Sequence, residues 1–340
     1  MARKKGVSSA SKLTLIDVAK IAGVSPITVS RVIREPDKVI PETRDKVLAA
    51  IKSSGYIPNM LAGSLASNKS FLVAILIPTI ANSILSETVQ AVIDHLSREN
   101  YQTIIGLTNY SHDTEEKIVK TLLGRRPDGI VLIGTDHTEA TRLCLKQSEI
   151  PVIEAWDLSE HPIDHVIGFS HEKIGQQTAH YLYEKGYKNI SLITVNDSRG
   201  LRRTNSAVDM LHRLGLKDVY VEIMPVPATT ESGRLGFQRL LNKNITMDAV
   251  ICSSDTIAQG VFIEANYRKL SIPKDVAVMG FGDLNFAPQL MPQLSTVQLN
   301  GRAIGEKIAQ TLLNAWQNKN QSLESVYLDT GFKIIEREST

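Results

Sequence analysis

The sequence predicts a small all-α domain at the N-terminus, followed by a larger α/β core built from two parallel, doubly wound sheets. Three observations support this prediction. Residues 14–34 carry two short helical patterns separated by a glycine, strand-like and helix-like segments alternate from residue 71 onward, and the charge differs between the two parts. The first 70 residues hold 12 Lys/Arg against 5 Asp/Glu, whereas residues 71–340 hold 26 against 31. A basic head on a mildly acidic body is typical of a DNA-binding domain joined to a sensor.

The first predicted helix begins after Thr14 and ends at Gly23. Thr14 is a good N-cap, and Asp17 stands three residues on, in a position like that of a capping box. Gly23 breaks the helix and supplies a turn. Apolar residues recur at helical spacing between them: Ile16, Val18, Ala19, Ile21 and Ala22.

The second predicted helix begins after Ser25, which is a favourable N-cap. Pro26 at its first position costs nothing, because that N–H would be unpaired in any case. Val29, Val32 and Ile33 recur at the spacing of a buried face. The residues left facing outward are Pro26, Ile27, Thr28, Ser30 and Arg31. Two short helices joined by a tight turn form a helix-turn-helix, whose second helix fits the major groove of DNA.

A third helix is predicted from Pro41 to about Ser54, and it ends at Gly55. Its start is weakly signalled, because Ile40 stands where a Ser or Asp cap would be expected. Residues 57–70 are short, polar and rich in Asn, Ser and Gly. Alone they would form a marginal helix or a linker.

From residue 71 the pattern changes to buried strands that alternate with amphipathic helices. The strand-like segments are 71–78, 101–109, 128–134, 151–157, 165–170, 189–195, 219–226, 248–254 and 275–282. The helix-like segments are 84–99, 112–124, 138–148, 172–186, 202–214, 230–243 and 255–269. This alternation is typical of parallel sheets. About 270 residues are too many for one sheet, so we expect two lobes with a ligand cleft beyond the carboxyl ends of their strands.

The cysteine content and the absence of long apolar segments indicate the cellular compartment and argue against a disulfide or metal site. Cys144 and Cys252 are the only cysteines, and their wide separation argues against a disulfide framework and against a metal site. The basic N-terminus has no apolar segment behind it, so it is not a signal peptide, and no apolar run is long enough to span a bilayer. We therefore expect a cytoplasmic protein without metal or cofactor and without a membrane partner, associated with the nucleoid when its head is bound to DNA.

With these motifs in place, the chain resembles the lac repressor/galactose repressor family of bacterial transcription regulators. The matching segments are TLIDVAKIAGVSPITVSRVIR, TRDKVLAAIKSSGYIPNMLAGSLAS, IPVIEAWD, DAVICSSD, VMGFGD, PQLSTVQLN and EREST. They span residues 13–340 in the family's order. Among its subgroups, YIPN, IPVIE and VMGFG are most similar to repressors of gluconate and related sugar-acid catabolism.

The resemblance implies a domain order. It places a basic arm at 1–12, a helix-turn-helix domain at 13–58, a hinge helix or linker at 59–70, and an effector-binding, dimerising core at 71–340. That core resembles periplasmic binding proteins, with an N-lobe at about 71–168 plus 299–325 and a C-lobe at about 169–298 plus 326–340. No leucine heptads follow the last strand-like stretch, YLDTGFKII, so a homodimer is expected rather than a coiled-coil tetramer.

The resemblance also implies how the head contacts a near-palindromic, double-stranded operator. Arg31 can donate two hydrogen bonds to guanine, Ile27 can contact a thymine methyl, and Pro26 donates nothing, so part of the specificity should come from DNA shape. Phosphate contacts are expected from Thr14, Ser25, Thr28, Ser30 and Arg34. The alternatives are helix capping or simple solvation for the hydroxyl residues and a surface salt bridge for Arg31. In the hinge, Leu65 matches the family's minor-groove wedge, with Asn59 and Ala62 beside it.

The family's effector cleft can be placed on this sequence. Arg203 matches an arginine that grips a ligand, although the neighbouring Arg202 leaves the register open by one residue. Gly282 stands where the family often has Asp, and an arginine without that carboxylate favours an anion over a neutral sugar. The expected effector-binding residues are Asn82, Leu85, Glu154, Trp156, Asp157, Arg203, Ser254, Asp255, Gly282 and Asp283. Trp156 can equally be a core residue, and Glu154 can instead pair internally.

The resulting interpretation is a sequence-specific repressor of gluconate- or idonate-type catabolic genes, released from its operator by a sugar acid bound between the lobes. Two alternatives within the family stay open: a neutral sugar or other metabolite as effector, and a ligand that promotes DNA binding. An enzyme is disfavoured, because the chain lacks a strand-linked G-x-G-x-x-G, a P-loop and a G-x-S-x-G. A periplasmic-type binding protein is disfavoured, because it would need a signal peptide and no DNA-binding head.

Overall fold

The computed structural model describes residues 13–57, 69–81, 83–318 and 324–340. By contacts, the chain divides into two compact units, residues 1–70 and 71–340. The head contains the helices α1 (Leu15–Ala22), α2 (Pro26–Arg34), η1 (Pro36–Lys38) and α3 (Pro41–Ser54). Helices α1, α2 and α3 begin where the sequence predicts, because caps and prolines act locally, whereas the short η1 was not predicted.

The head closes around a small apolar core. Val18, Val29 and Val47, one from each of the three α-helices, are fully buried in the same cluster. Ile16 and Ile21, by contrast, are each 55% exposed, although they keep the helical spacing of the buried residues. Helix α1 has only eight residues, and its apolar stripe is wider than the surface that the other helices of the head cover.

The core contains two six-stranded sheets. The first has the order β11-β5-β4-β3-β1-β2, and the second has the order β12-β10-β9-β8-β6-β7. The first sheet consists of β1 (Leu72–Ile77), β2 (Gln102–Leu107), β3 (Gly129–Ile133), β4 (Val152–Ala155), β5 (His165–Gly168) and β11 (Tyr327–Asp329). The second consists of β6 (Ile190–Val195), β7 (Val221–Met224), β8 (Ala249–Cys252), β9 (Ala277–Gly282), β10 (Ser295–Gln298) and β12 (Lys333–Ile335).

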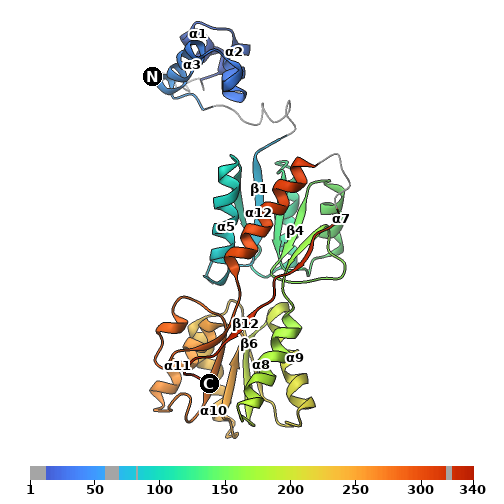
Figure 1. Cartoon of the computed structure of the whole chain (residues 1–340), viewed down its shortest axis with the longest axis vertical. Helices are drawn as coiled ribbons and strands as arrows, with labels where there is room; N and C mark the ends of the chain where they lie inside the picture. The colour runs from blue at the N-terminus through green and yellow to red at the C-terminus, as the bar shows by residue number, and fades with distance from the viewer. Residues whose placement is uncertain (1–12, 58–68, 82, 319–323) are drawn as a thin grey trace, which may run out of the picture. The chain divides into compact units, whose positions relative to one another are not determined.

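All strand pairs are parallel except β10 with β12. The first sheet carries α5 (Ser86–Arg98), α6 (His112–Leu123), α7 (Glu139–Gln147) and α12 (Gly301–Gln317), and the second carries α8 (His171–Glu184), α9 (Ser198–Arg213), α10 (Thr230–Asn242) and α11 (Asp255–Tyr267) (Figure 1). Short 3₁₀ turns lie at Ser83–Leu85 and Ala287–Gln289. The predicted two-lobed, doubly wound α/β core is therefore confirmed.

The chain crosses between the lobes three times. The crossings follow β5, β10 and β11, since each of these strands is succeeded by an element of the other lobe. The stretch YLDTGFKII, expected as one strand of the C-lobe, is two strands. Tyr327 of β11 pairs with Val166 in the first sheet, whereas Ile334 of β12 pairs with Val297 in the second. Residues 327–329 thus belong to the N-lobe sheet, and the third crossing lies after the expected residue 326.

Helix α9 begins at Ser198, four residues before the expected start at 202. Asp197 caps it, and its carboxylate accepts hydrogen bonds from the backbone N–H groups of Arg199 and Gly200. The sequence expectation missed this because Ser-Arg-Gly has no apolar periodicity. None of the described helices combines the length and apolarity that a membrane-spanning helix needs.

Candidate functional site

The head presents the start of α2 to solvent. Ser25 accepts a hydrogen bond from the Thr28 N–H at 3.2 Å, which fixes the first turn with Pro26 at its first position. Ile27 is 73% exposed, and Arg31 is exposed one turn further along. These side chains project from one surface of α2, in the arrangement that lets a recognition helix contact base edges.

The predicted phosphate-binding hydroxyl groups have local partners. Thr14 and Asp17 form a complete capping box, in which the Thr14 hydroxyl donates to the Asp17 carboxylate at 2.7 Å. The hydroxyl groups of Ser25 and Thr28 are 2.9 Å apart. Thr28 and Ser30 are half-buried. In this structure Thr14 and Ser25 cap helices, which is the alternative role that the sequence left open, and Thr28 is the partner of the Ser25 cap.

Several predicted DNA contacts lie outside the described residues. They are the basic arm at 1–12, the hinge residues Asn59, Ala62 and Leu65, and the side chain of Arg34. Asn82, predicted for the effector cleft, also lies outside the described residues.

The core contains a pocket between its lobes, with an empty volume of about 580 Å³ that includes space open to solvent. The N-lobe contributes Pro78, Thr79, Ile84, Leu85, Tyr110 and Trp156, and the C-lobe contributes His171, Val195, Asp197, Arg199, Arg203, Ala228, Ser253, Ser254 and Phe281. It lies beyond the carboxyl ends of parallel strands, where ligands of such sheets bind. Asp197 and Ser254 cap α9 and α11, so the N-terminal ends of two helices border the pocket.

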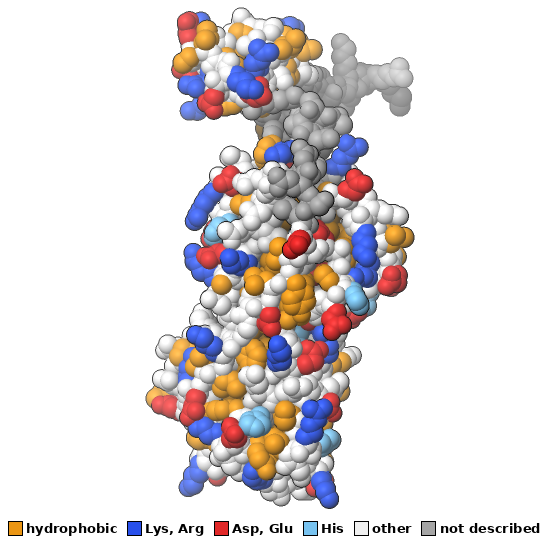
Figure 2. All heavy atoms as spheres, turned by 45° about the vertical axis from the view of Figure 1, so that its right-hand side comes forward, with side chains coloured by type: hydrophobic (Ala, Val, Ile, Leu, Met, Phe, Trp, Pro, Cys, Tyr) orange, Lys and Arg blue, Asp and Glu red, His pale blue; other side chains and the backbone are white. Residues whose placement is uncertain are grey.

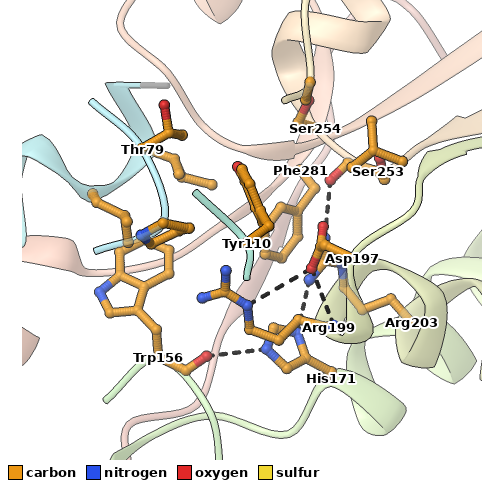
Figure 3. Close-up of a pocket in the computed structure, with 15 residues that line it drawn as sticks. Thr79, Tyr110, Trp156, His171, Asp197, Arg199, Arg203, Ser253, Ser254 and Phe281 are labelled. Carbon is orange, nitrogen blue, oxygen red and sulfur yellow. Dashed lines mark hydrogen bonds and ion pairs between the residues drawn. The ribbon is translucent and has the colours of Figure 1, made fainter. Parts of the chain in front are cut away.

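Arg203 is the most tightly held of the lining side chains. Its Nη1 lies 2.8 Å from Nδ1 of His171, and its Nη2 donates to the backbone oxygen of Ser253 at 3.0 Å. The guanidinium lies over the ring of Phe281, 3.8 Å from the centroid. Burial lowers the pKa of Arg203 to about 10, with the Asp197 charge opposing the shift, so the group stays charged at neutral pH. Figure 3 shows this side chain beside His171 and Asp197.

His171 links Arg203 to the other lobe. Its Nε2 lies 3.0 Å from the backbone oxygen of Trp156, which follows β4 in the N-lobe. Arginine can only donate, so Nδ1 of His171 accepts and Nε2 carries the proton. Burial and then the charge of Arg203 lower the pKa of His171 well below 6.5, so the ring is neutral at physiological pH.

Arg199 adds a second arginine that the sequence analysis did not select. It stands in the first turn of α9, and its Nε lies 3.7 Å from the Asp197 carboxylate. Figure 3 shows its guanidinium extending toward Trp156. Tyr110, from the N-lobe, is close enough that the Arg199 charge lowers its pKa, although burial dominates and raises it. The sequence signal that could have identified Arg199 is the N-cap Asp197 followed by Ser198 and Arg199, which begins a helix at the pocket.

Four of the predicted effector residues line the pocket: Leu85, Trp156, Arg203 and Ser254. The other described predictions do not. Glu154 is fully buried; its carboxylate accepts a hydrogen bond from the Ile163 N–H and lies 3.6 Å from both His137 and Arg142. Glu154 and Trp156 stand two residues apart, yet Trp156 has a φ of 64°, which ends the strand alternation and turns its ring into the pocket.

Asp157, Asp255 and Asp283 are engaged within the protein. Asp157 pairs with Arg202, which answers the register question, because Arg203 lines the pocket and Arg202 does not. Asp255 accepts from the Thr296 hydroxyl at 2.6 Å and from the Leu284 N–H at 2.7 Å.

Asp283 forms an ion pair with Arg337 at 2.7 Å. Gly282 has a φ of 129°, and a Cβ there would meet the Ile84 side chain at 2.9 Å. A missing carboxylate at this position therefore reflects backbone geometry and close packing between the lobes.

The pocket wall has an excess of positive charge. It holds two arginines and one carboxylate, and that carboxylate already caps α9. The visible face of the core, by contrast, shows both signs of charge interspersed (Figure 2). Partial desolvation strengthens the effect of the two arginines in the pocket.

Comparison with known proteins agrees with this architecture. The family described as "Bacterial regulatory proteins, lacI family" matches residues 14–59, and the one described as "Periplasmic binding proteins and sugar binding domain of LacI family" matches residues 72–334. The HTH-type transcriptional regulator GntR of Pseudomonas aeruginosa is 34% identical over 338 residues, covering 99% of this chain and 98% of the relative. The HTH-type transcriptional regulator IdnR of Escherichia coli is 32% identical over 330 residues, covering 95% and 97%. These relatives match the gluconate repressor subgroup indicated by the sequence motifs.

Solved structures agree as well. A LacI-family transcriptional regulator from Silicibacter pomeroyi superimposes with a TM-score of 0.90 at 31% identity, covering 96% of this chain and 99% of the other. The lac repressor dimer bound to operator and the anti-inducer ONPF gives a TM-score of 0.81 at 23% identity, covering 97% and 99%, which supports the fold alone. The chain therefore belongs to the lacI family of bacterial regulatory proteins, and it is a DNA-binding transcriptional regulator rather than an enzyme.

Proposed function

We propose that this regulator represses genes of sugar-acid catabolism and is released from its operator by a sugar acid of the gluconate or idonate type. The observation that carries the effector class is the pair Arg199 and Arg203 on one pocket wall, with one capping carboxylate between them. A guanidinium fork matches a carboxylate in shape and charge. The N–H groups at the start of α9 and α11 add partial positive charge on the same side.

The rest of the pocket suits a polyhydroxylated chain. Thr79 and Ser254 supply hydroxyl groups, and Tyr110 supplies a phenol from the N-lobe. Trp156 supplies apolar ring surface from the N-lobe, and Phe281 supplies it from the C-lobe beside Arg203. In the proposal, the carboxylate of the sugar acid binds the arginine wall, which is formed by Arg199 and Arg203 of the C-lobe. The hydroxyl-bearing chain of the ligand extends toward Thr79 and Trp156.

The DNA end of the proposal rests on α2. Arg31 pairs with a guanine, Ile27 contacts a thymine methyl, and Pro26 takes no part in hydrogen bonding. Two heads of a homodimer read the two halves of a near-palindromic operator. Two further sets of contacts complete the proposed DNA interface. Phosphate contacts are expected from Thr14, Ser25, Thr28, Ser30 and Arg34, and minor-groove contacts are expected from Asn59, Ala62 and Leu65.

Ligand and operator act on each other through linkage. A ligand that fits one arrangement of the lobes better than another shifts the equilibrium between them, and this changes operator affinity by the same factor by which the operator changes ligand affinity. If the ligand releases the protein from DNA, the ligand must bind best to the lobe arrangement that has the lower operator affinity.

One experiment tests the effector class. Purified protein is screened by thermal shift and then by calorimetry against gluconate, idonate, related sugar acids and the matching neutral sugars. The proposal expects stabilisation by sugar acids, and stabilisation by neutral sugars alone would overturn it.

A second experiment tests release. Operator sequences are selected from random double-stranded DNA, and binding is measured with and without the effector found in the screen. Tighter binding in its presence would support the opposite sign of control, and sedimentation of the complex measures whether two chains bind each site.

A further inference from the structure

Asp157 is a buried carboxylate that receives donors from both lobes. It lies just past the end of β4 in the N-lobe, with a side chain only 2% exposed. From its own lobe it accepts hydrogen bonds from the Thr135 hydroxyl at 3.0 Å and from the Leu158 N–H at 2.8 Å. From the C-lobe, Nη2 of Arg202 forms an ion pair with Oδ2. The ion pair therefore joins the two lobes, and its carboxylate is buried while the Arg202 side chain is 34% exposed.

Arg202 is held on its own side as well. Its Nη1 lies 3.6 Å from the Glu172 carboxylate at the start of α8. The guanidinium is thus shared between an exposed carboxylate of its own lobe and a buried one of the other lobe. Solvent screens the contact with Glu172, which is 49% exposed, more than it screens the contact with the buried Asp157.

The chain is built for close approach at this point. The backbone oxygen of Asp157 would lie 2.2 Å from a Cβ at Gly168, the last residue of β5 before the first crossing. Only glycine lets the segment that carries Asp157 pack against the strand that leads into the C-lobe. The ion pair therefore lies beside the first crossing between the lobes.

Adjacent residues connect this ion pair to the pocket. Trp156 and Asp157 are neighbours in the N-lobe, and Arg202 and Arg203 are neighbours in the first turns of α9. Arg203 reaches the backbone of Trp156 through His171, while Arg202 reaches Asp157 directly. Two successive residues of one lobe are therefore connected to two successive residues of the other. The connection between Trp156 and Arg203 lines the pocket, and the ion pair between Asp157 and Arg202 does not.

We infer that Arg202 is a positioning residue. Its ion pair with Asp157 holds the first turns of α9 against the end of β4, and so sets the distance between the arginine wall and the Trp156 wall of the pocket. It acts through Arg203 and Trp156, and the ligand does not touch it. This inference rests on the proposed function only in taking the pocket to be the ligand site.

The test uses a ligand-free readout from Trp156. The chain has two tryptophans, and Trp316→Phe leaves the full-length protein with Trp156, which is 4% exposed, as its only one. In that background Arg202→Gln and Asp157→Asn should each raise acrylamide quenching of Trp156 fluorescence several-fold. Arg202→Lys, which keeps the charge, should restore most of the protection. Arg213→Gln, at an exposed arginine in the last turn of α9, is the matched control.

The double variant separates positioning from loss of fold. If the two residues act as one pair, Arg202→Gln with Asp157→Asn should quench no more than either single variant, and their effects should not add. Additive effects, or quenching equal to that of Arg213→Gln, would overturn the inference. If Asp157→Asn fails to fold, the contrast between Arg202→Gln and Arg202→Lys decides the outcome.

Calorimetry with sodium gluconate gives the functional arm. Arg202→Gln should weaken gluconate binding about tenfold, within the usual range for a coupled pair, and Arg202→Lys should recover it. Unchanged gluconate affinity in Arg202→Gln would contradict the positioning role. Absence of gluconate binding in the parent protein would count against the proposed effector, and the quenching measurements would still decide the role of Arg202.

Discussion

Nη1 of Arg203 lies 2.8 Å from Nδ1 of His171, and this contact sets the protonation of the ring. The arginine donates, so Nδ1 must accept, and the proton on Nε2 is directed to the backbone oxygen of Trp156 at 3.0 Å. A neutral histidine of the same lobe thus orients the pocket-lining Arg203 and connects it to the backbone of Trp156 in the other lobe.

His171→Phe should therefore weaken effector binding, because it removes the ring nitrogen that holds Arg203 in place. Phenylalanine fills the ring's volume but leaves the buried Arg203 without one acceptor. A lost hydrogen bond to a charged group corresponds to a loss of about tenfold or more in affinity. Calorimetry with gluconate measures it, and wild-type affinity would show that Ser253 and Phe281 alone hold the guanidinium.

Arg199→Gln should discriminate between classes of ligand. Glutamine keeps hydrogen-bonding capacity but removes the charge nearest to Asp197. Affinity for gluconate should fall by about tenfold, as expected for loss of a charge-assisted hydrogen bond, while affinity for any neutral sugar that binds should change little. Arg213→Gln controls for charge lost elsewhere on α9, and an equal fall for both ligand classes would remove Arg199 from carboxylate recognition.

Arg31→Ala should separate specific from non-specific DNA binding. Loss of a bidentate contact to guanine costs about 1–3 kcal/mol of discrimination. The variant should keep weak, salt-dependent binding through its remaining basic residues. Fluorescence anisotropy with operator and with scrambled DNA measures both, and unchanged preference for the operator would contradict the assigned role.

Ser25→Ala should destabilise the head. Ser25 caps α2 by accepting the Thr28 N–H, and loss of such a cap costs about 1 kcal/mol. Hydrogen exchange of the α2 amides in the full chain measures the change. Thr229→Ala, which removes the equivalent cap of α10 in the core, is the control, and it should leave the exchange of α2 unchanged.

Asp255→Asn should flatten the pH dependence of stability. Burial raises the pKa of Asp255 to about 6 from 3.8, against the hydrogen bonds from Thr296 and Leu284. Because the folded state favours the protonated form, this stabilising contribution is complete below about pH 4 and is lost as the pH rises through about 6. The shift corresponds to about 3 kcal/mol as an order of magnitude. Denaturant unfolding between pH 4 and 7 measures the slope, and an equal slope in Asp255→Asn would contradict the assignment.

The sequence by itself determined the head and the succession of elements. Caps such as Thr14 and Ser25, the break at Gly23 and the apolar periodicity act over a few residues, and their consequences do not depend on distant contacts. The alternation of strands and helices likewise determined the doubly wound lobes. The expected start of α9 at 202 was wrong, because Ser198–Leu201 carries no periodic signal and depends on the Asp197 cap.

Only the tertiary structure decided which side chains share the pocket. Trp156 enters it and Glu154 does not, because the φ of Trp156 ends the strand alternation. Arg203 lines it and the adjacent Arg202 bridges to Asp157, because neighbouring positions on a helix point about 100° apart. Local propensity fixes where an element begins, but the direction of a side chain depends on helical phase, backbone dihedrals and the packing of one lobe against the other. These are set only when residues far apart in the sequence meet.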